Sequence, residues 1–278
     1  MVRDRLQALQ RCPHCGAEVF IKWGSKNGRQ RFRCKDATCG KTFSASTGSP
    51  LSGLHYPELH KKNAECMVDG LSIRKVAARL GINKSTAFRW RHRFLDPMQG
   101  RQPAKLGCVV EADETFFLES YKGSRNLPAG RKPKKRGTPA EKRGLSTEQI
   151  PVLVARDRST GTTLTVVLRN RSASDIGEVL LPRLSADTEL FSDGASAYRT
   201  LARKHEIALR IVPSHPKHKT SGAVHINNVN AYDSRLKGWM SRFKGVATKN
   251  LPNYLGWHRY LDATHGASAR EFLNVALS

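Results

Sequence analysis

The sequence predicts a multi-domain protein with a small β module, then an all-α module, then an α/β domain built on a mixed five-stranded sheet. Three observations predict this order. Four of the six cysteines fall between residues 12 and 39, a helical pattern broken by glycine occupies residues 60–95, and apolar runs alternate with helical patterns from residue 108 onward. The expected domains are residues 1–50, 51–104 and 105–278.

The chain carries a large excess of positive charge. Its 278 residues include 48 Lys and Arg against 23 Asp and Glu, which gives a formal net charge of +25 and a pI near 10.3. Such an excess repels itself unless a polyanion shares the surface, so double-stranded DNA is the expected partner. No apolar run reaches the roughly 18 to 20 residues of a membrane-spanning helix, and the N-terminus lacks a signal-peptide core. We therefore expect no membrane partner and a cytoplasmic, nucleoid-associated location.

The clustered cysteines have the spacing of a metal site. Two residues separate Cys12 from Cys15, four separate Cys34 from Cys39, and eighteen lie between the pairs. The intervening runs EVFIKWG and RQRFRC resemble short strands joined by the turn-forming SKNG. A reducing compartment favours metal over disulfide, and four thiolates carried on two hairpins suit the tetrahedron of structural Zn²⁺. We predict a zinc ribbon, with a disulfide pair as the alternative.

The second module reads as two helices joined by a glycine-containing turn. An apolar helical face in residues 73–80 ends at Gly81, and Asn83 or Ser85 can cap the next helix. A helix, a short turn and a second, basic helix are typical of a helix-turn-helix. The alternative is a basic helical hairpin that packs between domains.

The second helix of this pair is expected to read DNA. In this interpretation Phe88, Trp90 and Phe94 belong to the set that faces the core. Basic and small polar side chains would face the DNA. The expected DNA-binding residues are Lys84, Ser85, Thr86, Arg89, Arg91 and Arg93.

The third segment alternates strand and helix patterns. The run CVVEADETFFL predicts a buried strand, and IPVLVARD and GTTLTVVLR predict a hairpin. Helical spacing in SASDIGEVLLPRL, a short strand in TELFSD, a helix through AYRTLARKH and a strand in IALRIVP follow. A basic insertion at 119–149 has no periodicity and is expected to be a flexible loop.

Two aspartates follow apolar runs of this segment. We expect Asp113 and Asp193 to lie at the ends of two strands. Acids at adjacent strand ends can share divalent metal, and oxygen ligands suit Mg²⁺ or Mn²⁺. Two such ions, about 3.5 to 4 Å apart, can assist phosphoryl transfer. The alternative is that each aspartate is a turn or cap residue.

Several motifs together resemble a known family. They are CPHC with RCKDATCGKTFSASTGSPL, VEADETFF, LFSDGASAY, and HINNVNAYDSRLKGWMSRFKGVATKNLPNYLGWHRYL. In this order they resemble bacterial insertion-sequence transposases of the DDE type, in the group with a zinc ribbon, a helix-turn-helix and an ISXO-type ribonuclease-H-like catalytic domain. The resemblance covers nearly the whole chain.

The resemblance implies a set of catalytic residues. Asp113 matches the first catalytic aspartate and Asp193 the second. Many relatives read His-x-Asn-x-x-Glu followed by a lysine seven residues later. This chain reads HINNVN and then Lys237, so Asn230 stands at the glutamate position. That departure matches the variant in which asparagine replaces glutamate and a downstream lysine accompanies it.

The variant is physically reasonable. An amide oxygen lets Asn230 complete a metal sphere without adding charge. Seven helical residues place Lys237 on the same face about 10 Å away, where it would address a phosphate. Asp233 competes for the third position, whereas Glu114 would point to the opposite strand face from Asp113. Asn230 could instead be a helix cap or a surface amide.

The resulting hypothesis is a DNA transposase that binds terminal inverted repeats and catalyses metal-dependent strand cleavage and strand transfer. Chemistry on two element ends implies at least a dimer on DNA. The alternative is a non-catalytic zinc-ribbon and helix-turn-helix regulator with a degenerate third domain. The asparagine at position 230 is the feature that favours this alternative.

Overall fold

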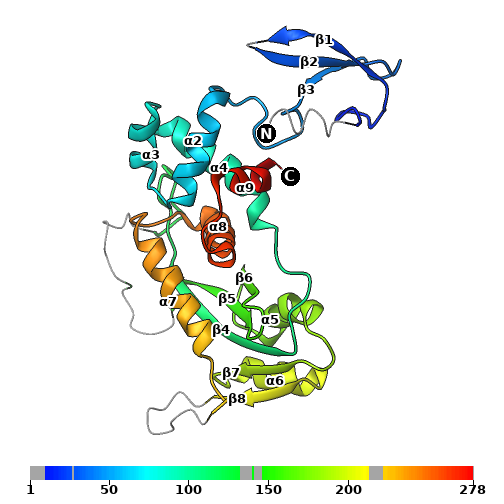
Figure 1. Ribbon diagram of the computed structural model, residues 1–278. Helices are drawn as coiled ribbons and strands as arrows, with labels where there is room; N and C mark the ends of the chain where they lie inside the picture. The colour runs from blue at the N-terminus through cyan, green and yellow to red at the C-terminus, as the bar shows by residue number, and fades with distance from the viewer. Residues whose placement is uncertain (1–9, 27, 132–139, 141–145, 213–221, 278) are drawn as a thin grey trace. The chain divides into compact units, whose positions relative to one another are not determined.

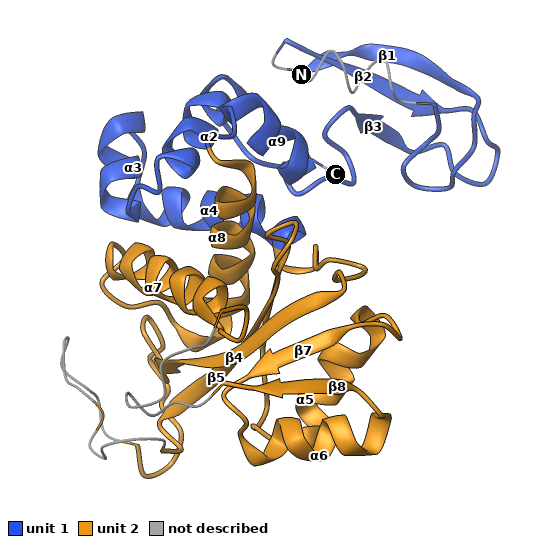
Figure 2. Cartoon of the chain, turned by 60° about the horizontal axis from the view of Figure 1, so that its bottom comes forward, with its two compact units in different colours: residues 1–98, 266–278 blue, residues 99–265 orange. Residues whose placement is uncertain are grey.

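The computed structural model describes residues 10–26, 28–131, 140, 146–212 and 222–277. Most of the expected basic insertion, residues 132–139 and 141–145, lies outside the described residues. The chain forms two compact units, shown in two colours in Figure 2. Unit 1 comprises residues 1–98 and 266–278, and unit 2 comprises residues 99–265.

The N-terminal module of unit 1 is a three-stranded antiparallel sheet. Its strands are β1 (Phe20–Lys26), β2 (Arg29–Cys34) and β3 (Thr42–Ser44), in the order β1-β2-β3. Phe20, Phe32 and Phe43 pack edge to face or stacked, with ring centroids 5.3 to 5.6 Å apart. With Ala17, Cys12, Cys34 and Cys39, these rings form the apolar cluster of the described part of the module, so its core is small.

The helical module is a helix-turn-helix, as the sequence predicts. It contains η1 (Pro57–Leu59), α2 (His60–Val68), α3 (Ile73–Leu80) and α4 (Lys84–Gln99). Gly81 ends α3 in the left-handed region, with φ 65°, where a Cβ atom would be strained. The side chain of Asn83 accepts a hydrogen bond from the amide of Ser85 at 2.9 Å, so Asn83 is the cap of α4.

The helical phase of α4 corrects two expectations. Its buried positions are Ala87, Trp90, Arg91, Phe94, Leu95 and Met98. Phe88 was expected in the core but is 46% exposed, because it follows Ala87 by about 100° around the helix. Arg91 was expected to contact DNA but is 1% exposed, and its guanidinium donates to the carbonyl of Leu71.

The C-terminal helix α9 (Ala269–Leu277) belongs to unit 1, although residues 105–278 were expected to form one domain. Its N-terminus is a capping box. The Ser268 amide donates to Glu271 Oε2 at 2.7 Å, and the Glu271 amide donates to Ser268 Oγ at 3.2 Å. Phe272, Leu273 and Ala276 are buried, and the helix packs against α2. This burial explains the assignment to unit 1.

Unit 2 is built on the predicted mixed five-stranded sheet (Figure 1). The strand order is β6-β5-β4-β7-β8. The pairs β4–β5 and β5–β6 are antiparallel, whereas β4–β7 and β7–β8 are parallel. The strands are β4 (Val109–Leu118), β5 (Gln149–Asp157), β6 (Thr163–Val167), β7 (Glu189–Ser192) and β8 (Ala208–Ile211).

Helices cover both faces of this sheet. On one face, α5 (Ala173–Leu180), which is followed by η2 (Leu181–Arg183), and α6 (Ser196–His205) pack on Val110, Ala112 and their neighbours in a continuous apolar core. On the other face lie α7 (Asn227–Ser241) and, after η3 (Thr248–Asn250), α8 (Leu251–Thr264). Alternate residues of β4 therefore face different helix layers.

Two arginines tie α7 and α8 to the sheet through a single carboxylate. Asp262 of α8 accepts from Arg156 of β5 at 2.9 Å and from Arg235 of α7 at 2.8 Å. Its side chain is 8% exposed, and these two arginines lower its pKa despite the burial that raises it. In the part of the chain that is described, no helix is long and apolar enough to cross a membrane.

Candidate functional site

The four N-terminal cysteines converge on one point. Their sulfur atoms all lie within 4.8 Å of one another, with Cys12–Cys39 at 3.9 Å and Cys15–Cys34 at 3.6 Å. Four thiolates at about 2.3 Å from a central zinc ion would be about 3.8 Å apart. The sulfur spacing therefore fits a tetrahedral metal, and the four side chains form a group that could hold one.

The exposed face of α4 is basic and polar. Lys84, Ser85 and Arg89 are exposed and Thr86 is half-buried. Phe88 lies on the same exposed surface, with its ring 4.4 Å from that of His92. Arg93 is exposed as well, but it donates to the backbone carbonyls of the loop before η1, at Pro50 (2.7 Å) and Ser52 (2.8 Å).

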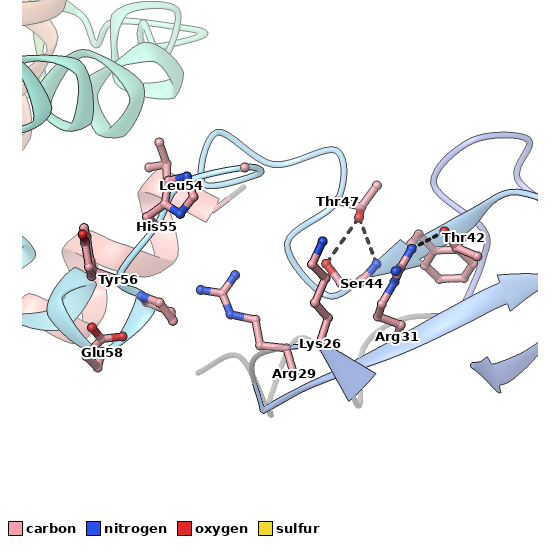
Figure 3. A pocket seen from close by; sticks show the side chains of 13 residues that line it. Lys26, Arg29, Arg31, Thr42, Ser44, Thr47, Leu54, His55, Tyr56 and Glu58 are labelled. Atoms are coloured by element: carbon pink, nitrogen blue, oxygen red, sulfur yellow. Dashed lines mark hydrogen bonds between the residues drawn. The ribbon is translucent and has the colours of Figure 1, made fainter. Parts of the chain in front are cut away.

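A second basic surface lies on the β module. A cavity of about 550 Å³ is lined by Lys26, Arg29 and Arg31 of the β1–β2 hairpin. Figure 3 shows these side chains opposite His55, Tyr56 and Glu58. With three cations and one acid among these six residues, the cavity has a positive charge.

In unit 2, strand register brings Asp113 and Asp193 together. The parallel pairing of β4 with β7 matches Val109 with Glu189 and Glu111 with Phe191. Continuing this register two residues past the Glu111–Phe191 pair sets Asp193, which directly follows β7, opposite Asp113. Asp113 lies in the middle of β4, not at its end as expected, because β4 continues to Leu118 along β5. The short β7 ends at Ser192 and leaves Asp113 at an open edge.

The negative charge of Asp193 acts on Asp113. Burial raises the pKa of Asp113, and the negative charge of Asp193 raises it further, whereas Lys237 lowers it. Asp193 is exposed, and its side chain accepts from the Ala195 amide at 2.9 Å, so it also caps the turn before α6. A cap was the alternative expectation for this aspartate. Its side chain can cap the turn and still offer an oxygen to a metal ion. A divalent cation would relieve the repulsion between the two acids.

Gly194 is required in the turn that presents Asp193. Its φ is 76°, and a Cβ atom there would lie 2.4 Å from Cγ2 of Ile211. Both the backbone conformation and the close approach of β8 therefore exclude a side chain. The turn keeps Asp193 directly beside the end of β7.

Glu114 points away from Asp113, as the alternation of a strand predicts. Its carboxylate accepts from the Tyr198 hydroxyl of α6 at 2.6 Å, on the opposite face of the sheet from α7. Burial raises the pKa of Glu114, although the Tyr198 hydrogen bond lowers it. This residue belongs to the α6 layer of the sheet.

Glu111 is a site residue that the sequence analysis missed. It is fully buried and accepts from the Asn228 amide at 2.8 Å, the Asn228 side chain at 2.8 Å and the Val229 amide at 3.0 Å. Arg158 Nε donates to it at 2.9 Å, and His225 Nδ1 lies 3.2 Å away. A buried carboxylate at the start of a helix satisfies the unpaired amides of the first turn. The only sequence signal was an acid two residues before Asp113 on the same strand face.

The anchored helix α7 presents the other predicted site residues. Asn230 and Lys237 are exposed, whereas Asp233 between them is 8% exposed. Helical geometry puts Asn230 and Lys237 within about 20° of each other around the axis, with Asp233 about 60° from Asn230 on the side nearer the sheet. Burial raises the pKa values of Asp113 and Asp233, and Lys237 is close enough to both for its charge to oppose that rise.

A cavity of about 660 Å³ lies where β4 and β6 end and β5 begins. Its lining includes Phe116, Gln149, Arg169 and Arg171. The guanidinium of Arg171 lies 5.6 Å from the Phe116 ring centroid, and Arg171 lowers the pKa of Glu114, which burial raises. Glu114 therefore has a basic cavity beside it.

Comparisons with known proteins identify the family of the chain. Residues 105–260, more than half of the chain, match the family model described as ISXO2-like transposase domain. Residues 64–100 match a homeodomain-like domain model. The chain is 29% identical over 256 residues to an uncharacterized protein in transposable element ISH50 of Halobacterium salinarum, covering 88% of this chain and 82% of that protein.

Solved structures with some similarity include two transposition or integration complexes. A chain of the simian T-cell lymphotropic virus intasome in complex with PP2A regulatory subunit B56 gamma is 13% identical, with a TM-score of 0.32; the match covers 70% of this chain and 66% of that chain, just under two thirds. A chain of a pre-cleavage Mos1 transpososome is 11% identical, with a TM-score of 0.31, over 78% of this chain and 77% of that chain.

The cysteine group predicts that the β module depends on metal. We expect one Zn²⁺ per chain by elemental analysis, and Cys34→Ser should lose the ion and the hydrogen-exchange protection of β1 and β2, since the apolar core is too small to replace it. Cys108→Ser, at an exposed thiol outside the cluster, should keep both. Full exchange protection in metal-free wild type would contradict a structural ion.

Removing the charge of Glu111 should weaken the attachment of the first turn of α7 to β4. In Glu111→Gln the Arg158 charge loses its partner, and a charge-assisted hydrogen bond of this kind contributes about 1.5 to 3 kcal/mol. The amides of Asn228 and Val229 should then exchange faster by more than about tenfold. Glu189→Gln, which breaks an exposed pair with Arg210, should leave those amides unchanged.

Proposed function

Because the chain belongs to the family with the ISXO2-like transposase domain, we propose that this DNA transposase binds the terminal inverted repeats of its element and cuts and joins DNA strands with divalent metal. The observation that supports the catalytic part is the β4–β7 register, because its continuation two residues past the Glu111–Phe191 pair sets Asp113 opposite Asp193. Carboxylate oxygens at one edge of a sheet are the donors that Mg²⁺ and Mn²⁺ prefer.

In this proposal Asp113 and Asp193 hold two divalent ions, and Asn230 offers a neutral amide oxygen to the same site. When bound, the ions would polarise the scissile phosphate and the attacking oxygen. Burial and the negative charge of Asp193 raise the pKa of Asp113. The ionised carboxylate is therefore disfavoured there unless a positive charge, such as a metal ion, is added. Asn230 brings no charge, so the site would also depend on oxygens of the DNA phosphate.

Lys237 serves as a phosphate contact. It is exposed, about two helical turns beyond Asn230 on the same side of α7, and its charge acts on Asp113 and Asp233. An ammonium group in this position would bind a phosphate next to the scissile one and so hold the strand in line for attack. Arg169 and Arg171, in the neighbouring basic cavity, extend the positive surface that a DNA strand would follow.

Unit 1 supplies DNA recognition. Lys84, Ser85, Thr86 and Arg89 occupy the exposed face of α4, the second helix of a helix-turn-helix, which enters the major groove in this motif. We leave Arg91 out of this set because it is buried, and we assign Arg93 to holding the loop at residues 50–52.

The zinc-bound β module would add phosphate contacts through its basic hairpin. Lys26, Arg29 and Arg31 supply the cations there. The cysteine group would hold structural Zn²⁺, which keeps the hairpin folded. Action on two element ends implies at least a dimer of this chain on DNA.

The aspartate pair predicts a charge-dependent cleavage reaction. On a duplex that carries the element end, with Mg²⁺ or Mn²⁺, Asp113→Asn and Asp193→Asn should each lower the cleavage rate on the order of 100-fold or more, equivalent to about 2.7 kcal/mol of transition-state stabilisation. Glu206→Gln, at an exposed acid directly after α6, should cut at the wild-type rate. Equal cutting by all variants would remove the two aspartates from the site. A wild type that binds the end but never cuts it would favour the non-catalytic regulator.

The exposed face of α4 predicts sequence-dependent binding. Arg89→Ala should weaken binding to the element end by about tenfold or more, since a lost base contact costs about 1 to 3 kcal/mol. Fluorescence anisotropy at fixed salt, with the end duplex and a shuffled duplex, measures both affinities. Arg203→Ala removes the same charge from α6 and should change neither. If Arg89→Ala weakens both duplexes equally, Arg89 contacts phosphate and carries no specificity.

A further inference from the structure

Asp233 is a buried carboxylate that has no role in the function proposed so far. It is 8% exposed, and in the described part of the chain its Oδ1 atom has no hydrogen-bond partner. An ionised carboxylate in such surroundings costs free energy unless a cation or several donors satisfy it. One oxygen of this side chain is therefore buried without a partner, and a bound cation would supply one.

The position of Asp233 follows from how α7 lies along β4. At the first turn of α7, Glu111 of β4 binds the amides of Asn228 and Val229. After the last turn, Lys122, four residues beyond β4, donates to the carbonyls of Lys244 at 3.3 Å and Gly245 at 2.6 Å. Helix and strand are joined at both ends, so they run in the same direction.

This direction brings Asp233 over Asp113. Asp233 is four residues beyond Val229, which is about 6 Å along a helix. Asp113 is two residues beyond Glu111, which is about 6.6 Å along a strand and on the same strand face. Measured from the contact between Glu111 and Val229, Asp233 lies about as far along α7 as Asp113 lies along β4. The two carboxylates are therefore level with each other.

The electrostatics agree with this placement. Burial raises the pKa of Asp233 to about 7, and the negative charge of Asp113 contributes to the rise, whereas Lys237 opposes it. Asp113 in turn is affected by Asp193. Three carboxylates from β4, the end of β7 and α7 therefore act on one region of unit 2.

We propose that Asp233 is a third carboxylate ligand of the divalent-metal site formed by Asp113 and Asp193. This inference rests on the proposed function. It resolves the charge deficit created by asparagine at position 230, because Asp233, three residues later on the same helix, supplies the missing negative charge from the side nearer the sheet. Asn230, the neutral ligand of the proposed site, is exposed and then contributes only weakly to metal binding, because a carboxylate holds a divalent cation more strongly than an amide oxygen does.

The test measures Mn²⁺ binding to the zinc-loaded full chain without DNA. The electron paramagnetic resonance signal of unbound Mn²⁺ gives the concentration of free ion. Asp233→Asn keeps the side-chain shape and removes the charge. We expect Asp233→Asn to weaken Mn²⁺ binding by at least about tenfold, and Asn230→Ala to change it by less than about threefold. Thermal unfolding should show that both variants remain folded.

The outcomes separate this inference from the proposed function. If Asp113→Asn and Asp193→Asn lose Mn²⁺ but Asp233→Asn binds it as wild type does, only the role of Asp233 is refuted. If Asn230→Ala alone among the α7 variants loses Mn²⁺, the asparagine is the third ligand. If wild type shows no saturable Mn²⁺ binding, both the two-aspartate site and this inference fail. If Asp233→Asn loses Mn²⁺ and also lowers the cleavage rate, the third carboxylate is established.

Discussion

The hydrogen bonds of Glu111 hold the candidate active site together. One buried carboxylate on β4 binds the first amides of α7 and is itself paired with Arg158. Every α7 residue assigned a role lies within nine residues of that anchor, so a helix rotated or shifted by one turn would move all of them away from Asp113. Because Glu111 is buried, any shift of α7 that removes its hydrogen-bond donors would leave an unpaired buried charge, which costs several kcal/mol.

Charge is distributed in opposite ways at the surface and at the site. The chain has a net charge of +25, yet three of its few acids act on one region of unit 2. Cations on α4, on the β1–β2 hairpin and near β6 suit the phosphate backbone of DNA. Acids gathered within a basic surface suit metal ions that act on that backbone. The contrast is what a metal-dependent enzyme acting on DNA requires.

The β module and unit 2 are stabilised in different ways. The β module has an apolar cluster of only a few rings and small residues, so we expect its fold to depend on a metal ion held by the four sulfur atoms. Unit 2 has a large apolar core between the sheet and α5 and α6. That core leaves the other sheet face available for polar groups such as Glu111 and Asp113, which meet α7.

The sequence by itself determined the order of modules, the cysteine spacing, the Gly81 turn and the five strands, because these depend on local pattern and periodicity. Only the tertiary structure decided which carboxylates meet. The register of β4 and β7, continued past its last pair, sets Asp193 opposite a mid-strand Asp113. The helix that Glu111 anchors buries Asp233 and exposes Asn230. Likewise, only packing showed that Arg91 is buried and Phe88 exposed. A local pattern cannot determine register or helix rotation, since both depend on contacts between distant residues.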